Sequence, residues 1–182
     1  MTENANENEN ENISAKISII GDGSVGKTSI ITRYYHDEFK LDYRPTLGAD
    51  FVIKTVESTN DAPDLDLYLW DLAGQTQYEQ MTTYFLKNSY FSLIVADIAK
   101  RTTWDLESWI SAHEKVAAKP ENKVIVLNKI DLVSSTEIEE IKQQFIEKFE
   151  LPVYTTSAKT GAHVNVLFDE ICNQIWNEFE SN

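Results

Sequence analysis

The stretch Gly21-Asp22-Gly23-Ser24-Val25-Gly26-Lys27-Thr28 decides the fold of this chain. It has the form G-x-x-x-x-G-K-[ST], which is the pattern of a phosphate-binding loop between a strand and a helix. Apolar Ile17, Ile19 and Ile20 precede it and predict a short buried strand, and residues 29–35 after it predict a helix. The pattern therefore lies in the context that it requires, and we expect a loop that binds phosphates.

Each residue type in this loop has a physical role. Glycines at 21, 23 and 26 allow backbone conformations in which successive N–H groups turn toward an anion. The N-terminus of the following helix attracts the same anion with its partial positive charge. The ammonium of Lys27 would lie between the terminal phosphates, and the hydroxyl of Thr28 suits Mg²⁺, which prefers oxygen ligands. An accidental glycine-rich turn is the alternative, and the flanking strand and helix argue against it.

Composition narrows the classes of function. The chain has 182 residues, of which 42% are hydrophobic and 25% charged, so one domain with a full core is expected. The net charge of −14 would repel a phosphate backbone, and we expect no binding to nucleic acid. Cys172 is the single cysteine, which excludes an internal disulfide, and its helical surroundings indicate a small core residue.

The chain termini carry their own expectations. Residues 1–12 alternate Asn and Glu with almost nothing apolar and predict a disordered acidic tail, with a regulatory arm as the alternative. Residues 13–180 then form the folded domain. The sequence shows no signal peptide, no apolar stretch long enough to span a bilayer and no terminal cysteine to prenylate. We therefore expect a cytoplasmic protein without an intrinsic membrane anchor, and a monomer.

Strand and helix patterns alternate along the chain. Strands are predicted at residues 17–20, 51–56, 65–70, 91–96, 123–127 and 151–155, and helices at 29–35, 102–118, 137–149 and 164–179. Residues 58–64 predict a hairpin turn, so one strand is antiparallel. The pattern predicts an α/β fold with a mostly parallel sheet, and ligands bind such sheets at the carboxyl ends of the strands. The polar connection 36–50 is long and indicates a functional loop.

Candidate residues for phosphate chemistry follow one of these strands. Asp71 ends the strand 65–70, and its carboxylate would hold Mg²⁺ directly or through water. The N–H of Gly74 would meet a terminal phosphate, and the side chain of Gln75 would orient an attacking water. Thr46, in the polar loop, would supply a second hydroxyl to Mg²⁺. We therefore expect a metal site made of Thr28, Thr46 and Asp71.

Two further motifs indicate which base is bound. Asp131, in Asn128-Lys129-Ile130-Asp131, can accept from two N–H donors on one base edge. Guanine has that pair of donors and adenine lacks it, so the motif favours guanine. The segment Ser157-Ala158-Lys159 follows the last strand, where a backbone N–H would meet the guanine oxygen.

The order of these motifs resembles the Ras superfamily of small GTPases over residues 14–178. The segments Pro45-Thr46-Leu47-Gly48-Ala49-Asp50-Phe51 and Trp70-Asp71-Leu72-Ala73-Gly74-Gln75 are most similar to the Rab branch. The resemblance implies a P-loop NTPase G domain, in which a six-stranded mostly parallel sheet with one antiparallel strand is flanked by five helices. The six predicted strands agree with that architecture.

The resemblance also implies roles for single residues. Phe39 would stack on the guanine, with simple packing as the alternative, and Tyr43 would cover the phosphates. Loops around 36–50 and 71–82 would be the two switches, and Phe51, Trp70 and Phe85 would form an aromatic triad under the effector surface. The implied catalytic residues are Lys27, Thr46, Gly74 and Gln75. The implied nucleotide-binding residues are Gly21, Asp22, Gly23, Ser24, Val25, Gly26, Lys27, Thr28, Ser29, Phe39, Tyr43, Thr46, Gly74, Asn128, Lys129, Asp131, Ser157, Ala158 and Lys159.

The implied function is that of a switch, acting in membrane trafficking or signalling. The protein would bind GTP or GDP with Mg²⁺, hydrolyse GTP slowly, and bind effector, activating and exchange proteins according to its nucleotide. Two other interpretations stay open: a module that binds nucleotide without hydrolysing it, and a P-loop kinase or ATPase. Hydrolysis under single-turnover conditions separates the first from a GTPase, and the base preference of Asp131→Asn separates the second.

Overall fold

The computed structural model describes residues 12–39, 46–59, 62–74 and 79–181. Within these ranges one sheet has the strand order β2-β3-β1-β4-β5-β6. The strands are β1 (Ile13–Ile20), β2 (Ala49–Val56), β3 (Leu65–Leu72), β4 (Phe91–Asp97), β5 (Lys123–Asn128) and β6 (Val153–Thr156). Only β2 pairs antiparallel among these strands, so the predicted mostly parallel α/β fold is confirmed.

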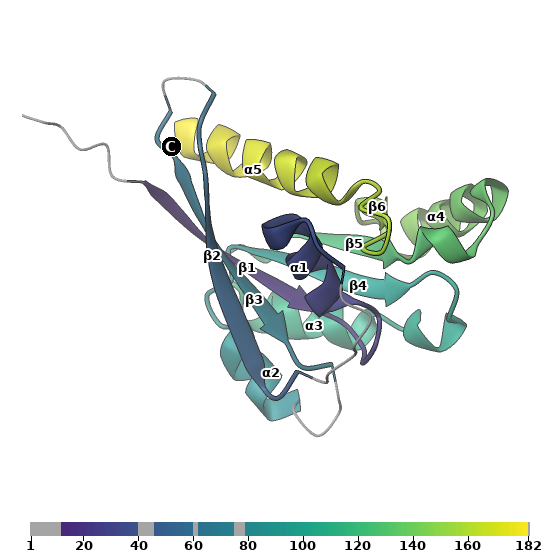
Figure 1. Cartoon of the computed structure of the whole chain (residues 1–182). Coiled ribbons are helices and arrows are strands. Elements are labelled where there is room, and N and C mark those ends of the chain that lie inside the picture. Colours follow the sequence, from purple (N-terminus) through teal and green to yellow (C-terminus); the bar gives the residue numbers. More distant parts are fainter. Residues whose placement is uncertain (1–11, 40–45, 60–61, 75–78, 182) are drawn as a thin grey trace, which may run out of the picture.

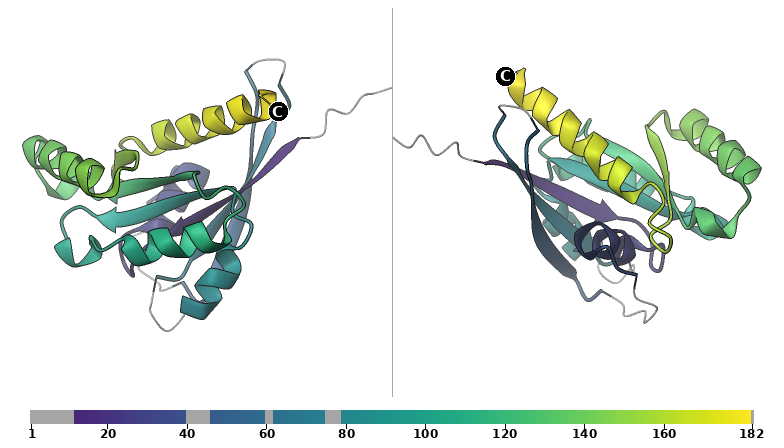
Figure 2. Two further views of the ribbon diagram at one scale, coloured as in Figure 1. Left: turned by 180° about the vertical axis from the view of Figure 1, so that it is seen from behind. Right: turned by 45° about the horizontal axis from the view of Figure 1, so that its top comes forward.

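Helices cover both faces of the sheet. They are α1 (Lys27–His36), α2 (Glu79–Leu86), α3 (Glu107–Val116), α4 (Ser135–Phe149) and α5 (Val164–Glu180), with short 3₁₀ turns at Arg101–Thr103 and Ile130–Leu132. Figure 1 shows α1 and α5 in front of the sheet. Figure 2, which includes the view from behind, shows α3 across the opposite face. Strands β4 and β5 are therefore buried on both sides.

Alternation along β4 shows how the two cores are built. Phe91, Leu93 and Val95 pack on the side of α1 and α5, whereas Ile94 and Ala96 pack on the side of α2, α3 and α4. All five side chains are at most 1% exposed. A strand that is covered on both faces needs apolar residues at most positions, and buried Ser92, the polar residue within β4, is paired with the His113 ring at 2.8 Å.

The connectivity indicates where a ligand would bind. β1 lies between β3 and β4, so the chain leaves β1 toward one side of the sheet and returns to the other side at β4. In open α/β sheets the crevice at such a change of direction is the usual ligand site. Residues 21–28, hereafter the phosphate loop, connect β1 to α1 at this point.

The predicted helices differ from the structure in two places: one begins too early, and one observed helix was not predicted. The predicted helix 102–118 begins too early, because Thr103 and Trp104 bind the end of β4 instead. The indole Nε1 of Trp104 donates to the Asp97 carbonyl at 2.9 Å, and the Asp97 N–H donates to the Thr103 hydroxyl at 3.1 Å. Helix α2 was not predicted from the pattern, since its consecutive threonines have low helix propensity.

Other expectations can be compared directly. The predicted hairpin at 58–64 is confirmed by the antiparallel register that pairs Val56 with Leu65. The predicted tail, apart from Asn12, lies outside the described residues. Within the part of the chain that is described, no helix is both long enough and apolar enough to cross a membrane.

Candidate nucleotide-binding site

The phosphate loop adopts a backbone that side chains tolerate poorly. Gly21 has φ +132° and Gly26 has φ +102°, and Ser24 also lies in the left-handed region with φ +66°. A Cβ on Gly21 would collide with the Val95 carbonyl, and one on Gly26 would collide with the side-chain amide of Asn128. Glycine is therefore required at 21 and 26 by the close approach of neighbouring strands, as well as by φ.

The ammonium of Lys27 lies inside the curve of this loop. Its Nζ donates to the carbonyls of Gly21 and Asp22, each at 2.8 Å, and the residue is only 6% exposed. Burial lowers the pKa of Lys27 to about 8, although the charges of Asp71 and Asp22 draw it upward. A buried cation at the N-terminus of a helix is an arrangement that a phosphate would stabilise.

Oxygen atoms from three elements meet beside Lys27. The Asp71 carboxylate, at the end of β3, accepts from the Thr28 hydroxyl at 2.5 Å and from the Thr46 hydroxyl at 2.9 Å, both through Oδ2. The two hydroxyl oxygens are 3.1 Å apart. The three residues predicted as metal ligands are thus brought together.

Asp71 has the properties that a cation would stabilise. Its Oδ1 is buried and has no hydrogen-bond partner among the residues that the structure describes. Burial raises the pKa of Asp71, while hydrogen bonds from Thr28 and Thr46 and the charge of Lys27 oppose this shift. A hard divalent cation such as Mg²⁺ fits this set of carboxylate and hydroxyl oxygens, and when bound it would neutralise phosphate charge.

The backbone at Gly74 lies against the phosphate loop. A Cβ at this position would collide with the Gly21 carbonyl and with Nζ of Lys27. Its neighbour Ala73 donates its N–H to the carbonyl of Gly48 at 2.8 Å, which connects the ends of the two predicted switch loops. Thr46, through its bond to Asp71, and Gly74, through its contact with Lys27, therefore both lie next to the predicted phosphate site.

Asn128 links the phosphate loop to residues 157–163, hereafter the base loop. Its Nδ2 donates to the Val25 carbonyl at 2.9 Å, and its Oδ1 accepts from the Ala158 N–H at 3.1 Å and from the Thr156 hydroxyl at 3.2 Å. The residue is 1% exposed. Its side chain thus organises the two loops through contacts within the protein.

The remaining base residues lie around the same loop. The Asp131 carboxylate accepts from the Ser157 hydroxyl at 2.6 Å and lies 3.5 Å from Nζ of Lys159. Lys129 forms an ion pair with Asp97 at 2.7 Å and donates to the Ser24 carbonyl, also at 2.7 Å. A base held by Asp131 would therefore belong to a nucleotide whose phosphates lie in the phosphate loop.

Comparison with known proteins now decides the family. A sequence model of the Ras family matches residues 16–177. The chain belongs to this family. Ras and Rab proteins are GTPases, so this chain is a GTP phosphohydrolase by family, and its relatives bind GTP or GDP together with Mg²⁺.

Curated relatives of this Ras-family GTPase carry Rab names. This chain is 32% identical to the Ras-related protein Rab-11A of Dictyostelium discoideum over an alignment of 163 residues. The alignment covers 88% of this chain and 75% of Rab-11A. The chain is 35% identical over 166 residues to the Ras-related protein RABA4a of Arabidopsis thaliana, which covers 89% of this chain and 72% of that protein. The chain is therefore Rab-like.

Two of the predicted site residues cannot be compared with the structure. Tyr43 and Gln75 lie outside the described residues, so their expected roles stay predictions. Phe39 is described and partly buried, and it follows the C-terminal end of α1 by three residues. Gly23 and Ser29 lie in the loop and in the first turn of α1 as expected.

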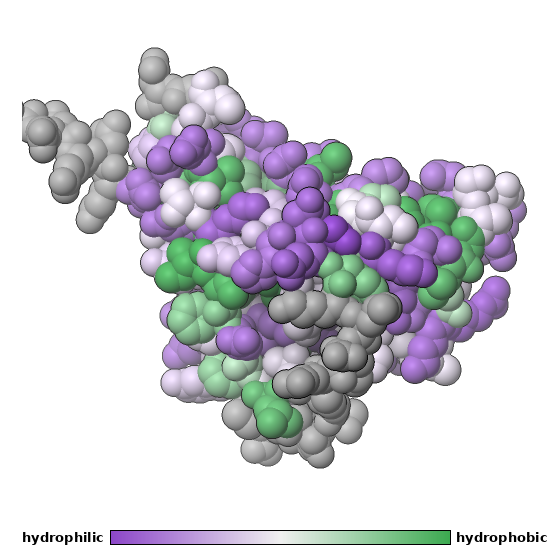
Figure 3. Space-filling view, in the orientation of Figure 1, coloured by the Kyte–Doolittle hydropathy of each residue, from purple (hydrophilic) through white to green (hydrophobic). Residues whose placement is uncertain are grey.

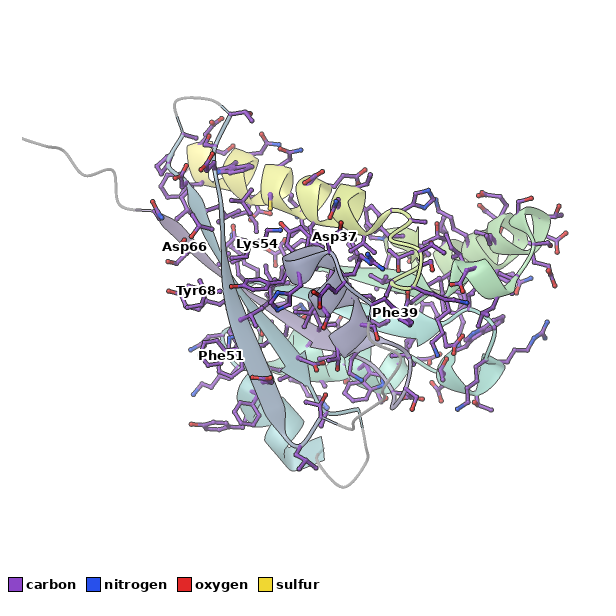
Figure 4. The ribbon with its side chains drawn as sticks, viewed as in Figure 1. Asp37, Phe39, Phe51, Lys54, Asp66 and Tyr68 are labelled. Carbon is purple, nitrogen blue, oxygen red and sulfur yellow. The ribbon has the colours of Figure 1, made fainter. Side chains whose placement is uncertain are left out.

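The aromatic triad of this Ras-family GTPase forms one connected group. Phe51 stacks on Trp70 with ring centroids 5.0 Å apart, and Trp70 lies 5.8 Å from Phe85. Phe51 is 49% exposed, and the neighbouring Ile53 on β2 is 44% exposed. Figure 3 shows hydrophobic side chains gathered at the left of the view, over β2 and β3, and Figure 4 labels Phe51 there. An exposed aromatic patch of this kind suits protein binding.

Sequence reasoning missed two residues that organise the site. Asp97 holds Lys129 through the ion pair described above, and the Trp109 indole donates to the Asp22 carboxylate at 3.0 Å. Asp97 ends β4 at the carboxyl edge of the sheet. Because ligand sites gather at that edge, its position could have identified it as a site residue. Trp109 lies on an ordinary apolar helix face and gave no such signal.

We predict that Gly26→Ala destabilises the protein far more than Gly161→Ala. Both glycines have positive φ, but the new methyl group at 26 would displace Asn128, whereas at 161 its nearest neighbour is the Arg33 side chain at 3.6 Å. We expect a loss of about 3 kcal/mol or more in unfolding free energy for Gly26→Ala and about 1 kcal/mol for Gly161→Ala. Urea titration followed by circular dichroism measures both, and equal losses would contradict the steric argument.

Proposed function

We propose that this Rab-like GTPase binds GTP and GDP with Mg²⁺, hydrolyses GTP slowly, and uses the difference between the two states to control partner proteins. The observation that carries this proposal is the convergence of the Thr28 and Thr46 hydroxyls on buried Asp71, beside the buried ammonium of Lys27. These groups come from three separate elements, and together they provide a cation and a cation-binding oxygen cluster next to backbone N–H donors. A triphosphate with its metal requires that combination.

In the proposed reaction the protein supplies positioning and charge rather than covalent chemistry. Lys27 and the N–H groups of the phosphate loop hold the terminal phosphates and offset the negative charge that develops there. Gln75 orients the water that attacks the terminal phosphorus. Slow turnover is expected, since Ras itself hydrolyses GTP at about 10⁻⁴ s⁻¹ and an arginine from an activating protein accelerates it about 10⁵-fold.

The proposed switch follows from the positions of Thr46 and Gly74. Both lie beside the predicted terminal phosphate, and the hydrogen bond from Ala73 to Gly48 joins their segments. Loss of that phosphate would remove an interaction from both segments at once, which is an order-to-disorder signal. We propose that effector, activating and exchange proteins sense this change next to the surface formed by Phe51, Trp70 and Phe85.

Single-turnover hydrolysis tests the proposal. We expect the protein loaded with GTP and Mg²⁺ to convert it to GDP, and Gln75→Leu to slow that step at least about tenfold while it retains nucleotide, because positioning of the attacking water is lost. Gln143→Leu changes an exposed glutamine on α4 whose amide donates to Glu147 at 2.9 Å; it is the matched control and should react at the wild-type rate.

Two results would contradict the proposal. Wild-type protein that retains GTP without hydrolysing it, even with an activating protein, would favour the module that only binds nucleotide. Hydrolysis of ATP in preference to GTP would favour the P-loop ATPase.

A further inference from the structure

The guanidinium of Arg33 joins two segments that are far apart in the sequence. Its Nε donates to the Ala158 carbonyl at 3.0 Å and one terminal nitrogen donates to the Lys159 carbonyl at 2.9 Å. The other terminal nitrogen donates to Asp37, to its carbonyl at 2.8 Å and to its carboxylate at 3.1 Å. The side chain is only 16% exposed. One side chain on α1 thus binds three residues at once.

The segments that Arg33 joins are the two sides of the predicted base pocket. Ala158 and Lys159 belong to the base loop, whose Ser157 hydroxyl orients the carboxylate of Asp131. Asp37 ends α1 in the left-handed conformation, with φ +54°, and precedes Phe39 by two residues. Figure 4 shows Asp37 and Phe39 beside α1. The residue predicted to recognise the base edge and the residue predicted to stack on the base are therefore connected through Arg33.

The geometry requires a planar group with several donors. Arginine carries five N–H donors in a fixed fork, and in this structure they reach acceptors on both sides of the guanidinium. A lysine ammonium is a single point and would bind one side only. The base loop has its own internal contacts, such as the Gly161 N–H to the Ser157 carbonyl at 2.8 Å. Arg33 connects the already formed loop to the end of α1.

We propose that Arg33 is a positioning residue that slows the release of bound guanine nucleotide by holding the two sides of the base pocket together. The inference rests on the proposed function, because it requires a guanine nucleotide in that pocket. Release requires the base to leave past Phe39 or past the base loop, and Arg33 opposes the separation of those segments. Its removal changes mainly the dissociation rate, which is where most differences in affinity between related complexes arise.

The test measures the release of a fluorescent GDP analogue with a large excess of GDP. We expect Arg33→Met to raise the dissociation rate at least about tenfold, and Arg33→Lys to raise it by an intermediate amount, since one side of the contact survives. The single-turnover hydrolysis of GTP that is still bound should stay within about twofold of wild type, because the phosphate site is untouched.

Two control variants separate this role from general destabilisation. Asp37→Asn removes only the charge of the exposed carboxylate and tolerates the left-handed backbone at this position, so it should change the dissociation rate less than about twofold. Arg101→Met removes an exposed arginine that lies against the Trp104 ring, far from the base loop in the sequence, and should have no effect. Circular dichroism and thermal unfolding show whether each variant is folded at the assay temperature.

The outcomes are distinct. Wild-type protein that binds no fluorescent GDP would overturn the proposed function itself. Wild-type binding together with an unchanged dissociation rate in Arg33→Met would overturn only the role of Arg33, and so would a parallel loss of hydrolysis in the bound state. If Arg33→Met does not fold, Arg33→Lys decides: a raised dissociation rate supports the inference, and the wild-type rate overturns it.

Discussion

Asp131→Asn should lose guanine nucleotides and gain xanthine nucleotides. The Asp131 carboxylate is 13% exposed and is oriented by the Ser157 hydroxyl at 2.6 Å, so it can accept both N–H donors of a guanine edge. Two hydrogen bonds to a charged group contribute about 1.5–3 kcal/mol each, so GDP affinity should fall at least about 100-fold. The amide of Asn can instead donate to the additional carbonyl of xanthine. Competition of GDP and XDP against a fluorescent nucleotide measures the change.

Ser157→Ala is the matched control for that experiment. It removes the hydroxyl that orients the carboxylate and leaves the carboxylate itself in place, so we expect a loss of about tenfold or less without any change in base preference. An Asp131→Asn variant that keeps the wild-type preference for GDP would show that Asp131 does not contact the base edge.

Lys27→Met should abolish nucleotide binding in the micromolar range. Lys27 is the buried cation of the phosphate loop, and methionine keeps most of its volume while it removes the charge. Truncating one partner of a buried charge pair costs about 2–5 kcal/mol, so affinity for GDP should fall at least about 100-fold, with a larger loss for GTP. Isothermal titration calorimetry with each nucleotide and Mg²⁺ measures both losses.

Lys148→Met is the control for this loss of charge. Lys148 forms an ion pair with Glu107 between α4 and α3, and its side chain is 53% exposed. Removing it changes the net charge of the protein by the same amount, and we expect nucleotide affinity to stay within about twofold of wild type. A Lys27→Met variant that is folded and binds GTP as wild type would contradict the assignment of the phosphate loop.

The sequence was most informative about the sheet. Strands β4 and β5 are covered on both faces, so most of their residues are apolar, and this constraint is visible as a nearly continuous apolar run. The start of α4 also has a sequence signature, because a serine followed three residues later by a glutamate is typical of a capping box, and Ser134 and Glu137 each bond the backbone of the other. Helix α2 was not visible, since its short sequence contains consecutive threonines, which have low helix propensity.

The candidate site was predicted as a set of residues but not as a set of contacts. The pattern of the phosphate loop indicated Lys27 and Thr28, and the strand ends indicated Asp71 and Asp131. The sequence did not indicate that Asn128 uses its side-chain amide to connect Val25 to Ala158. Bonds from a side chain to a distant backbone carbonyl depend on tertiary packing, and they leave no periodicity in the sequence to detect.

Arg33 illustrates the same limit. In the sequence it is a polar residue on the helix after the phosphate loop, where a solvated arginine is the ordinary expectation. In the structure its acceptors come from residues 125 and 126 positions away, so only the folded chain shows what it binds.

The identity of the nucleotide bound to the purified protein tests the central claim most directly. The protein is heated, the released nucleotide is separated by chromatography, and its amount is compared with that of the protein. We predict GDP or GTP at close to one molecule per chain, since the phosphate loop and Asp131 would then both act as assigned. An adenine nucleotide in that fraction, or no retained nucleotide together with no binding of added GDP and Mg²⁺, would contradict the account.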